Sequence, residues 1–185
     1  MHLAESDVRR ASELADRAIR FDPRWARAQK LRGDCLRRED RWREALAAYH
    51  LALSIQSHYP EARMAIAQIY HEHGRPERAL STLQALASEL APDEAPPELE
   101  YWQGIVSMSL GRYKDAIAHL TRAESRGFRT AELLCCLAEA HHKVGDEFAA
   151  RLAWNQALQL QPQHPQAQHA VPAVDQQRRM ANLPD

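Results

Sequence analysis

Apolar and small residues recur along the chain with the spacing of one helix face. An alanine opens such a stripe at five places, and apolar or small residues follow it four and seven positions later. Side chains with this spacing lie on one side of an α-helix, so each stripe predicts an amphipathic helix. The alanines are Ala11, Ala45, Ala79, Ala116 and Ala150, separated by steps of 34, 34, 37 and 34 residues. The chain is therefore predicted to be an array of repeats.

A second helical pattern precedes each of the last four alanines. It has a small residue at its middle, namely Gly33, Ala67, Gly104 and Ala138, and it is followed by a turn residue, namely Asp40, Gly74, Gly111 and Gly145. Small residues allow two helices to approach closely, and glycine suits the left-handed backbone that ends a helix. Each unit is thus predicted to be a helix, a tight turn and a second helix. Pro23, Pro92 and Pro162 fall where the second helices end.

This pattern resembles the tetratricopeptide repeat family, whose unit of about 34 residues carries W-x2-L-G-x2-Y, then A-x3-F, then P. The second helix is matched by Ala45-x3-Tyr49 and Ala150-x3-Trp154, and the first is matched in part by Ala67-x2-Tyr70 and Leu137-Ala138. The tryptophan that opens each first helix is replaced by Gln29, Arg63, Glu100 and Leu134. The resemblance implies an all-α fold, an α-solenoid of antiparallel helix pairs wound into a right-handed superhelix.

The predicted array spans residues 1–162. It consists of a half unit over 6–23 and full units over about 26–57, 60–91, 97–128 and 131–162. A proline-rich, lengthened turn lies over 91–97, where we expect a loop rather than a domain break, because a repeat needs both neighbours to bury its apolar face. Residues 163–185 are predicted to form either a capping helix, seated by Val174, Met180 and Leu183, or a disordered tail.

Charge is balanced over the whole chain, with 24 Lys and Arg against 25 Asp and Glu, but residues 1–43 carry twelve basic and eight acidic side chains. This balance argues against nucleic acid and membrane surfaces as partners, and we interpret the basic stretch as a solvated helix face. Trp25 and Trp42 lie within it at helix-packing spacings and are expected in the core. No signal pattern or apolar run of roughly 20 residues occurs, so we expect a cytoplasmic protein.

Candidate chemistry is sparse. Cys35, Cys135 and Cys136 form neither a disulfide framework nor a metal-spaced pair, and we expect reduced, partly buried thiols. The histidines of His71-x-His73 and His141-His142 lack the i, i+4 spacing typical of helical metal pairs. No phosphate loop, serine elbow or Cys–His arrangement is visible. We therefore assign no catalytic residue, metal or cofactor, and we expect a protein that is not an enzyme.

The resemblance implies that the first helices line a concave groove for a partner peptide or protein. The groove residues it implies are Lys30, Asp34 and Arg37 in the first full unit, Met64, Gln68 and His71 in the second, Tyr101, Ile105 and Met108 in the third, and Cys135, Glu139 and His142 in the fourth. Family members that grip the carboxylate tail of heat-shock chaperones use a clamp of Lys, Asn and Arg. Only Lys30 matches that clamp, so we do not expect that ligand.

The third full unit is unusual because its first helix carries two apolar stripes. One contains Leu99 and Val106, and the other contains Tyr101, Ile105 and Met108. The second stripe either packs on neighbouring helices or forms an apolar pocket for a partner. The leading functional hypothesis is a protein–protein interaction adaptor or scaffold. The alternatives are a structural protein that self-assembles head to tail through its array ends into a homo-oligomer, and a regulatory or assembly segment of a larger multidomain protein.

Overall fold

The computed structural model describes residues 2–91, 94–168 and 170, and it describes the side chains among them from residue 7 onward. All regular secondary structure in this described part is helical, which confirms the predicted all-α helical repeat fold. The helices are α1 His2–Phe21, α2 Ala26–Arg38, α3 Trp42–Ile55, α4 Pro60–Glu72, α5 Pro76–Glu89, α6 Pro97–Ser109, α7 Tyr113–Ser125, α8 Ala131–Lys143 and α9 Glu147–Leu160. We call α2, α4, α6 and α8 the first helices, and α1, α3, α5, α7 and α9 the second helices.

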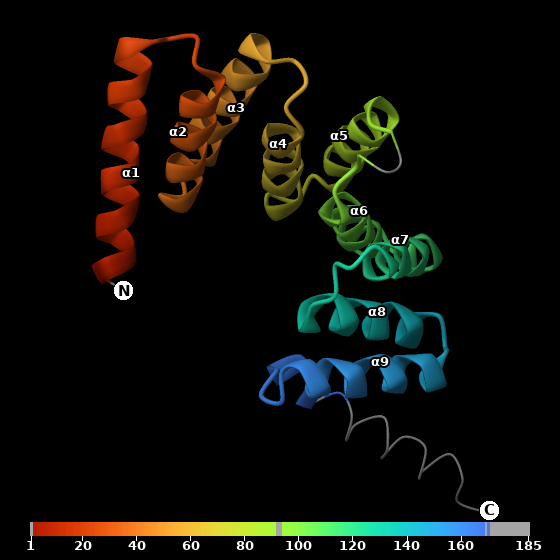
Figure 1. The fold of residues 1–185 in the computed structure, drawn as a ribbon. Helices are drawn as coiled ribbons and strands as arrows, with labels where there is room; N and C mark the ends of the chain where they lie inside the picture. Colours follow the sequence, from red (N-terminus) through yellow and green to blue (C-terminus); the bar gives the residue numbers. More distant parts are fainter. Residues whose placement is uncertain (1, 92–93, 169, 171–185) are drawn as a thin grey trace, which may run out of the picture. The chain divides into compact units, whose positions relative to one another are not determined.

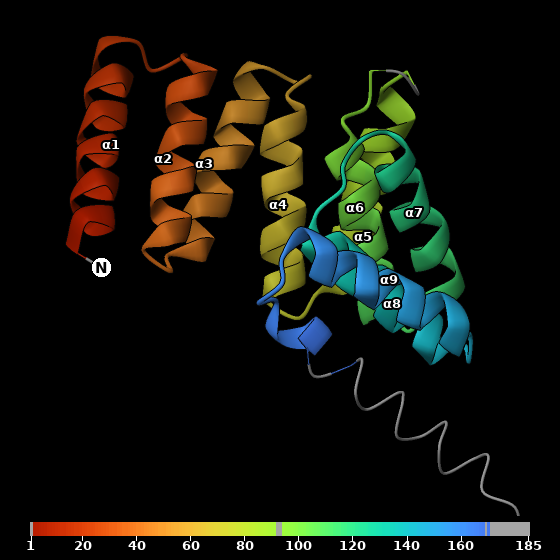
Figure 2. The same ribbon diagram turned by 60° about the horizontal axis from the view of Figure 1, so that its bottom comes forward.

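The described helices form two compact units, one up to Glu89 and one from Leu90 onward. In the first unit each helix from α1 to α5 packs on the next, and in the second unit the same holds from α6 to α9. Figures 1 and 2 show α1 to α4 side by side in the first unit and α8 along α9 in the second. The division falls between Glu89 and Leu90, just before the lengthened turn over 91–97, where the sequence predicted a loop within one array.

Local sequence sets where the first helices begin and end. Pro60 and Pro97 occupy the first turn of α4 and α6, where a missing N–H costs no helical hydrogen bond. Behind α4, Gly74 has a φ of 68°, a left-handed conformation that glycine adopts without steric cost. The same turn after α2 is made by Asp40 with a φ of 60°, which a residue with a Cβ adopts only at some cost.

Four of the five alanines that define the repeat lie in the core. Ala45, Ala79, Ala116 and Ala150 have no exposed surface. Near them, the small middle residue of a first helix meets a large side chain of the following second helix. A Cβ built on Gly33 would lie 2.6 Å from Tyr49 Cε1, and one on Gly104 would lie 2.6 Å from Leu120 Cγ. The two helices of these units therefore pack more closely than a side chain at the glycine would permit.

Different side chains replace the family's tryptophan, and each one is accommodated. Leu134 is fully buried in the core of the second unit. Gln29 is also buried, and its Nε2 donates a hydrogen bond to the Pro23 carbonyl at 3.3 Å. Arg63 forms an ion pair with Glu89 of α5 at 2.5 Å. The replacing side chain is thus buried in the core, bonded to a turn or paired with the next helix, depending on the unit.

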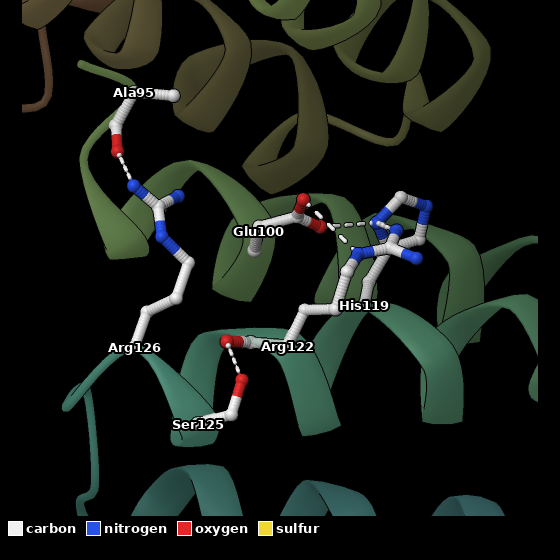
Figure 3. A network of polar contacts seen from close by, with 6 residues as sticks. All are labelled: Ala95, Glu100, His119, Arg122, Ser125 and Arg126. Carbon is white, nitrogen blue, oxygen red and sulfur yellow. Dashed lines mark hydrogen bonds and ion pairs between the residues drawn. The ribbon is translucent and has the colours of Figure 1, made fainter. Parts of the chain in front are cut away.

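Glu100 takes this position in α6, where it joins a polar network with α7 (Figure 3). Its Oε2 lies 2.6 Å from His119 Nδ1, and its Oε1 accepts a hydrogen bond from Arg122 Nε at 3.1 Å. Arg126 of the following turn donates to the Ala95 carbonyl. Burial opposes the ionisation of Glu100, but the hydrogen bonds from His119 and Arg122 outweigh it and hold its pKa below the usual value. Polar contacts therefore hold α6 against α7 here.

The prediction of a core position is wrong for Trp25. This residue is 49% exposed because it precedes the first turn of α2 as its N-cap and lies off the apolar stripe. Trp42 is partly buried and packs against the core of the first unit. Its ring stacks on His73 with centroids 4.4 Å apart, and the Arg43 and Arg75 guanidinium carbons lie 4.9 and 5.7 Å from the ring centroid.

The chain starts another helical turn after α9, over residues 165–168. His164 and Ala167 are buried there, and Ala167 belongs to the core of the second unit. The first residues of the predicted 163–185 segment are thus packed on the last repeat. The proposed cap residues Val174, Met180 and Leu183 lie outside the described residues.

Candidate polypeptide-binding surface

Asp34 is the centre of a polar cluster on the first unit. Its Oδ2 accepts a hydrogen bond from Lys30 Nζ one helical turn earlier, at 2.8 Å. Its Oδ1 accepts a hydrogen bond from the hydroxyl of Tyr49 on α3, also at 2.8 Å. Both carboxylate oxygens are therefore engaged, and the orientation of this partly exposed side chain is fixed from two helices.

Arg37 joins the two first helices of the first unit. Its Nη1 donates to Gln68 Oε1 on α4 at 2.5 Å, and its Nε donates to Glu72 Oε2 at 3.3 Å. A second guanidinium nitrogen bonds the other oxygen of Glu72, so the ion pair is bidentate. The structure thus brings together Arg37 and Gln68, which the family resemblance implied as groove residues. Glu72 was missed, although it lies one helical turn after Gln68 on the same face of α4.

Met64 and His71 also lie on α4, and both are half-buried. Burial is the main cause that lowers the pKa of His71 below its usual value, and the charge of Glu72 opposes this shift. His71 is consequently neutral at neutral pH. Lys30 is paired with Asp34 on this face, and Arg37 is paired with Glu72.

An open cavity of about 700 Å³ lies beside the Asp34 cluster in the first unit. Asp34 and Arg37, two of the implied groove residues, form part of its wall together with the buried Tyr49. The remaining lining residues are Asp7, Val8 and Ala11 of α1, Leu31, Cys35 and Arg38 of α2, and Glu72 of α4. The wall is therefore polar and charged on the α2 and α4 sides and largely apolar on the α1 side.

The second apolar stripe of α6 is only partly available to a partner. Tyr101 and Met108 are half-buried and pack against the core of the second unit. The Tyr101 ring lies 5.0 Å from the Phe128 ring, and burial raises the pKa of its hydroxyl to about 12. Ile105 is half-buried as well. Truncating Tyr101 or Met108 will therefore disturb packing as well as surface chemistry.

Cys135 requires a correction, because its side chain lies in the core of the second unit. It is 3% exposed, and its Sγ lies 3.3 Å from Nδ1 of the buried His164. Burial raises the pKa of the Cys135 thiol to about 11, which is the opposite of what a nucleophilic cysteine requires. The sequence did not indicate this contact, since the two residues are 29 positions apart on separate elements.

The other two implied residues of α8 differ from each other. Glu139 is exposed. His142 is half-buried, and its Nδ1 lies 2.7 Å from Glu147 Oε1 at the start of α9. The His142 ring also lies 6.0 Å from the Trp154 ring. His142 is thus held against α9, whereas Glu139 is open to a partner.

Within the described ranges, no three His, Cys, Asp or Glu side chains are grouped so that they would hold a metal ion. In the same part of the chain, no helix has the length and apolar character needed to cross a membrane.

Comparison with family profiles gives two matches, both to the tetratricopeptide repeat, over residues 2–60 and 36–97. Together they reach across more than half of the chain. The chain therefore belongs to the tetratricopeptide repeat family, as the repeat pattern indicated. Repeats of this family generally mediate protein–protein interactions, and the fold is typically non-catalytic. Comparison with curated protein sequences gives no match.

Solved structures share this fold at low sequence identity. YrrB, described as a protein of this family with an unusual peptide-binding site, has a TM-score of 0.69 at 19% identity, covering 90% of this chain and 84% of its own. TTC0263, a thermophilic protein of this family from Thermus thermophilus, has a TM-score of 0.70 at 20% identity, covering 93% and 92%. The Cut9–Hcn1 hetero-tetramer of APC/C has a TM-score of 0.81 at 20% identity, covering 98% of this chain and 35% of that one. These likenesses concern the fold alone.

Proposed function

We propose that the chain is a non-catalytic adaptor or scaffold that binds a partner polypeptide through its first helices. The observation that carries this proposal is the connected polar face of α2 and α4, which borders an open cavity of about 700 Å³. The Asp34 and Arg37 side chains are already held by neighbours, so little side-chain freedom is lost when a partner binds. Such pre-ordered groups favour recognition of polar side chains and backbone groups of a polypeptide.

The proposed partner contacts differ between the two units. In the first unit we propose Lys30, Asp34, Arg37, Met64, Gln68 and His71. In the second unit we propose Ile105, Glu139 and the exposed edges of Tyr101, Met108 and His142. The family's general role in protein interaction supports this assignment, and the peptide-binding site described for YrrB is a precedent on the same fold.

Selection of a displayed library of random peptides on the full chain tests this function. The strongest peptides are then measured by fluorescence anisotropy against the wild type, Arg37→Ala and Arg78→Ala. Arg78 is the matched control, because it is an exposed arginine on the second helix α5. We expect Arg37→Ala to weaken binding by about tenfold or more, since loss of a charged, hydrogen-bonded anchor commonly costs about 2 kcal/mol. Arg78→Ala should bind like the wild type.

A matched pair of substitutions in the second unit extends the same test. Ile105→Asp places a charge on the first helix α6, whereas Thr121→Asp places one on the exposed surface of the second helix α7. We expect only the first change to weaken peptides that contact this unit. Equal effects of all four variants, or a library that gives no binder, would contradict the proposed function.

A further inference from the structure

One face of α1 is more exposed than the same face of every other second helix in the described part. Ala11 and Ala18 are half-buried. Their counterparts in α3, α5, α7 and α9 are at most 1% exposed, namely Ala45, Ala79, Ala116 and Ala150 for Ala11, and Ala52, Leu86, Ala123 and Ala157 for Ala18. Leu14 is 59% exposed, whereas its counterparts Ala48, Thr82, His119 and Ala153 are buried or half-buried.

The difference arises because the first helix of the same unit covers this face in the later repeats. In the third full unit, for example, a Cβ on Gly104 of α6 would lie 3.4 Å from the Ala116 carbonyl oxygen of α7. No first helix among the described residues covers α1 in this way. The face of α1 that contains Ala11, Leu14 and Ala18 is therefore shaped to pack against a helix.

The geometry of α1 excludes a covering helix joined as in the other units. α3 begins at Trp42, three residues before Ala45, and a tight turn precedes it. α1 begins at His2, nine residues before Ala11, and is 20 residues long against 13 or 14 for the other second helices. It stays helical through the positions where the other units have their turn. A tight turn of this kind therefore cannot join a covering helix to α1.

The chemistry of this face indicates what kind of helix fits. Ala11, Leu14, Ala18 and the 92% exposed Phe21 form one apolar stripe along α1. Arg10 and Arg17 are seven positions apart and border the edge of the stripe that faces away from α2. Both are exposed, and neither side chain has an ion pair or hydrogen bond among the described residues. The stripe is therefore apolar, and the edge that faces away from α2 carries basic side chains without a partner in the described part of the chain.

We propose that this α1 docking face, Ala11, Leu14, Ala18 and Phe21, binds an amphipathic α-helix of another polypeptide whose apolar stripe is bordered by Asp or Glu. Each first helix of the described repeats has 13 residues, or about 20 Å, which sets the length of the helix that fits. Ala11 also lines the cavity described above, so the bound helix adjoins α2. This binding is of the helix-in-groove kind and does not depend on the proposed function of the first helices.

Two synthetic, helix-stabilised peptides test the proposal on the full chain. Both carry the same leucine stripe, which is bordered by Glu in one peptide and by Lys in the other. Binding is measured by fluorescence anisotropy at low and high salt. We expect the Glu-bordered peptide to bind about tenfold or more tightly than the Lys-bordered peptide, with a preference that falls as salt rises.

Variants of α1 identify the surface used. Arg10→Glu with Arg17→Glu should reverse the preference between the two peptides. The matched control, Arg9→Glu with Arg20→Glu, makes the same charge change on positions away from the stripe and should leave the preference unchanged. Leu14→Asp and, separately, Phe21→Ser should abolish binding of both peptides while the thermal midpoint stays within about 2 °C, because both side chains are mainly exposed.

Three results would overturn the proposal. The first is equal binding of both peptides, or of neither, to the wild type. The second is a large drop in the thermal midpoint for Leu14→Asp and for Phe21→Ser, which would make the stripe part of the core. The third is concentration-dependent self-association of the wild type that Leu14→Asp removes, which would identify a second copy of the chain as the occupant.

Discussion

The close approach of α2 and α3 predicts an uncommon response to a small change, Gly33→Ala. Alanine favours a helix interior by about 1 kcal/mol relative to glycine. Its Cβ, however, would lie 2.6, 2.8 and 2.9 Å from three ring atoms of Tyr49, so the ring must move by roughly 0.8 Å to reach ordinary contact. Tyr49 is fully buried, and its hydroxyl is bonded to Asp34, so the ring has little room to move.

Overpacking of this kind costs about 1–3 kcal/mol, which exceeds the gain in helix propensity. With the gain of about 1 kcal/mol subtracted, we expect Gly33→Ala to lower the free energy of unfolding by up to about 2 kcal/mol, or the thermal midpoint by up to about 8 °C. The companion change Tyr49→Leu should itself cost about 1–3 kcal/mol through a cavity and a lost hydrogen bond. The double variant recreates the Ala67 and Leu83 pair that the next unit already uses.

The wild type, the two single variants and the double variant form a double-mutant cycle. Their free energies of unfolding are measured by chemical denaturation, monitored by circular dichroism. We expect the double variant to be more stable than the sum of the two single effects by about 1–2 kcal/mol. Additivity within about 0.5 kcal/mol would refute the reasoning. A stabilising Gly33→Ala would refute it as well, because the Tyr49 ring would then not be confined.

Three further changes have defined outcomes. Glu100→Gln should lower stability above about pH 4.5 and have little effect well below that pH. The folded-state pKa of Glu100 is depressed, so the stabilising contribution of its carboxylate is lost as the pH falls through this folded-state pKa. Thermal melts across a range of pH check this prediction. Cys135 and Cys136, with thiol pKa values raised by burial to about 11 and about 12, should resist alkylation at pH 8 in the native chain and react after denaturation, as mass spectrometry would show. Asp40→Gly should raise stability by about 0.5–1 kcal/mol, since its φ of 60° suits glycine; an unchanged denaturation midpoint would contradict this.

The repeat was predictable from the sequence because its signals are local. The spacing of Ala45 and Ala79 gives the helix face, and the turn at Gly74 gives the helix end. Position in the repeat also indicated that Asp34 and Arg37 share one face of α2. The contacts at the family's tryptophan position were harder to predict, because the four residues that replace the tryptophan have different surroundings in each unit.

The contacts made by individual side chains were not predictable, since they depend on packing between elements. The bidentate pair of Arg37 and Glu72 joins residues 35 positions apart. Cys135 follows the groove register of α8, but the turn that carries His164 covers it. Trp25 has helix-packing spacing, yet it precedes the helix that would have buried it. Periodicity in the sequence predicts which residues share one face of a helix. Which elements pack over that face depends on the fold of the whole unit.

Amide hydrogen exchange of the full chain, with and without a selected peptide, is the most direct test of binding by the first helices. We predict slower exchange on binding in α2 and α4, or in α6 and α8, for peptides that Arg37→Ala or Ile105→Asp weakens. Exchange in the exposed second helices α3, α5 and α7 should change little. Protection confined to those second helices would contradict binding through the first helices and would place the partner on the opposite surface of the repeat.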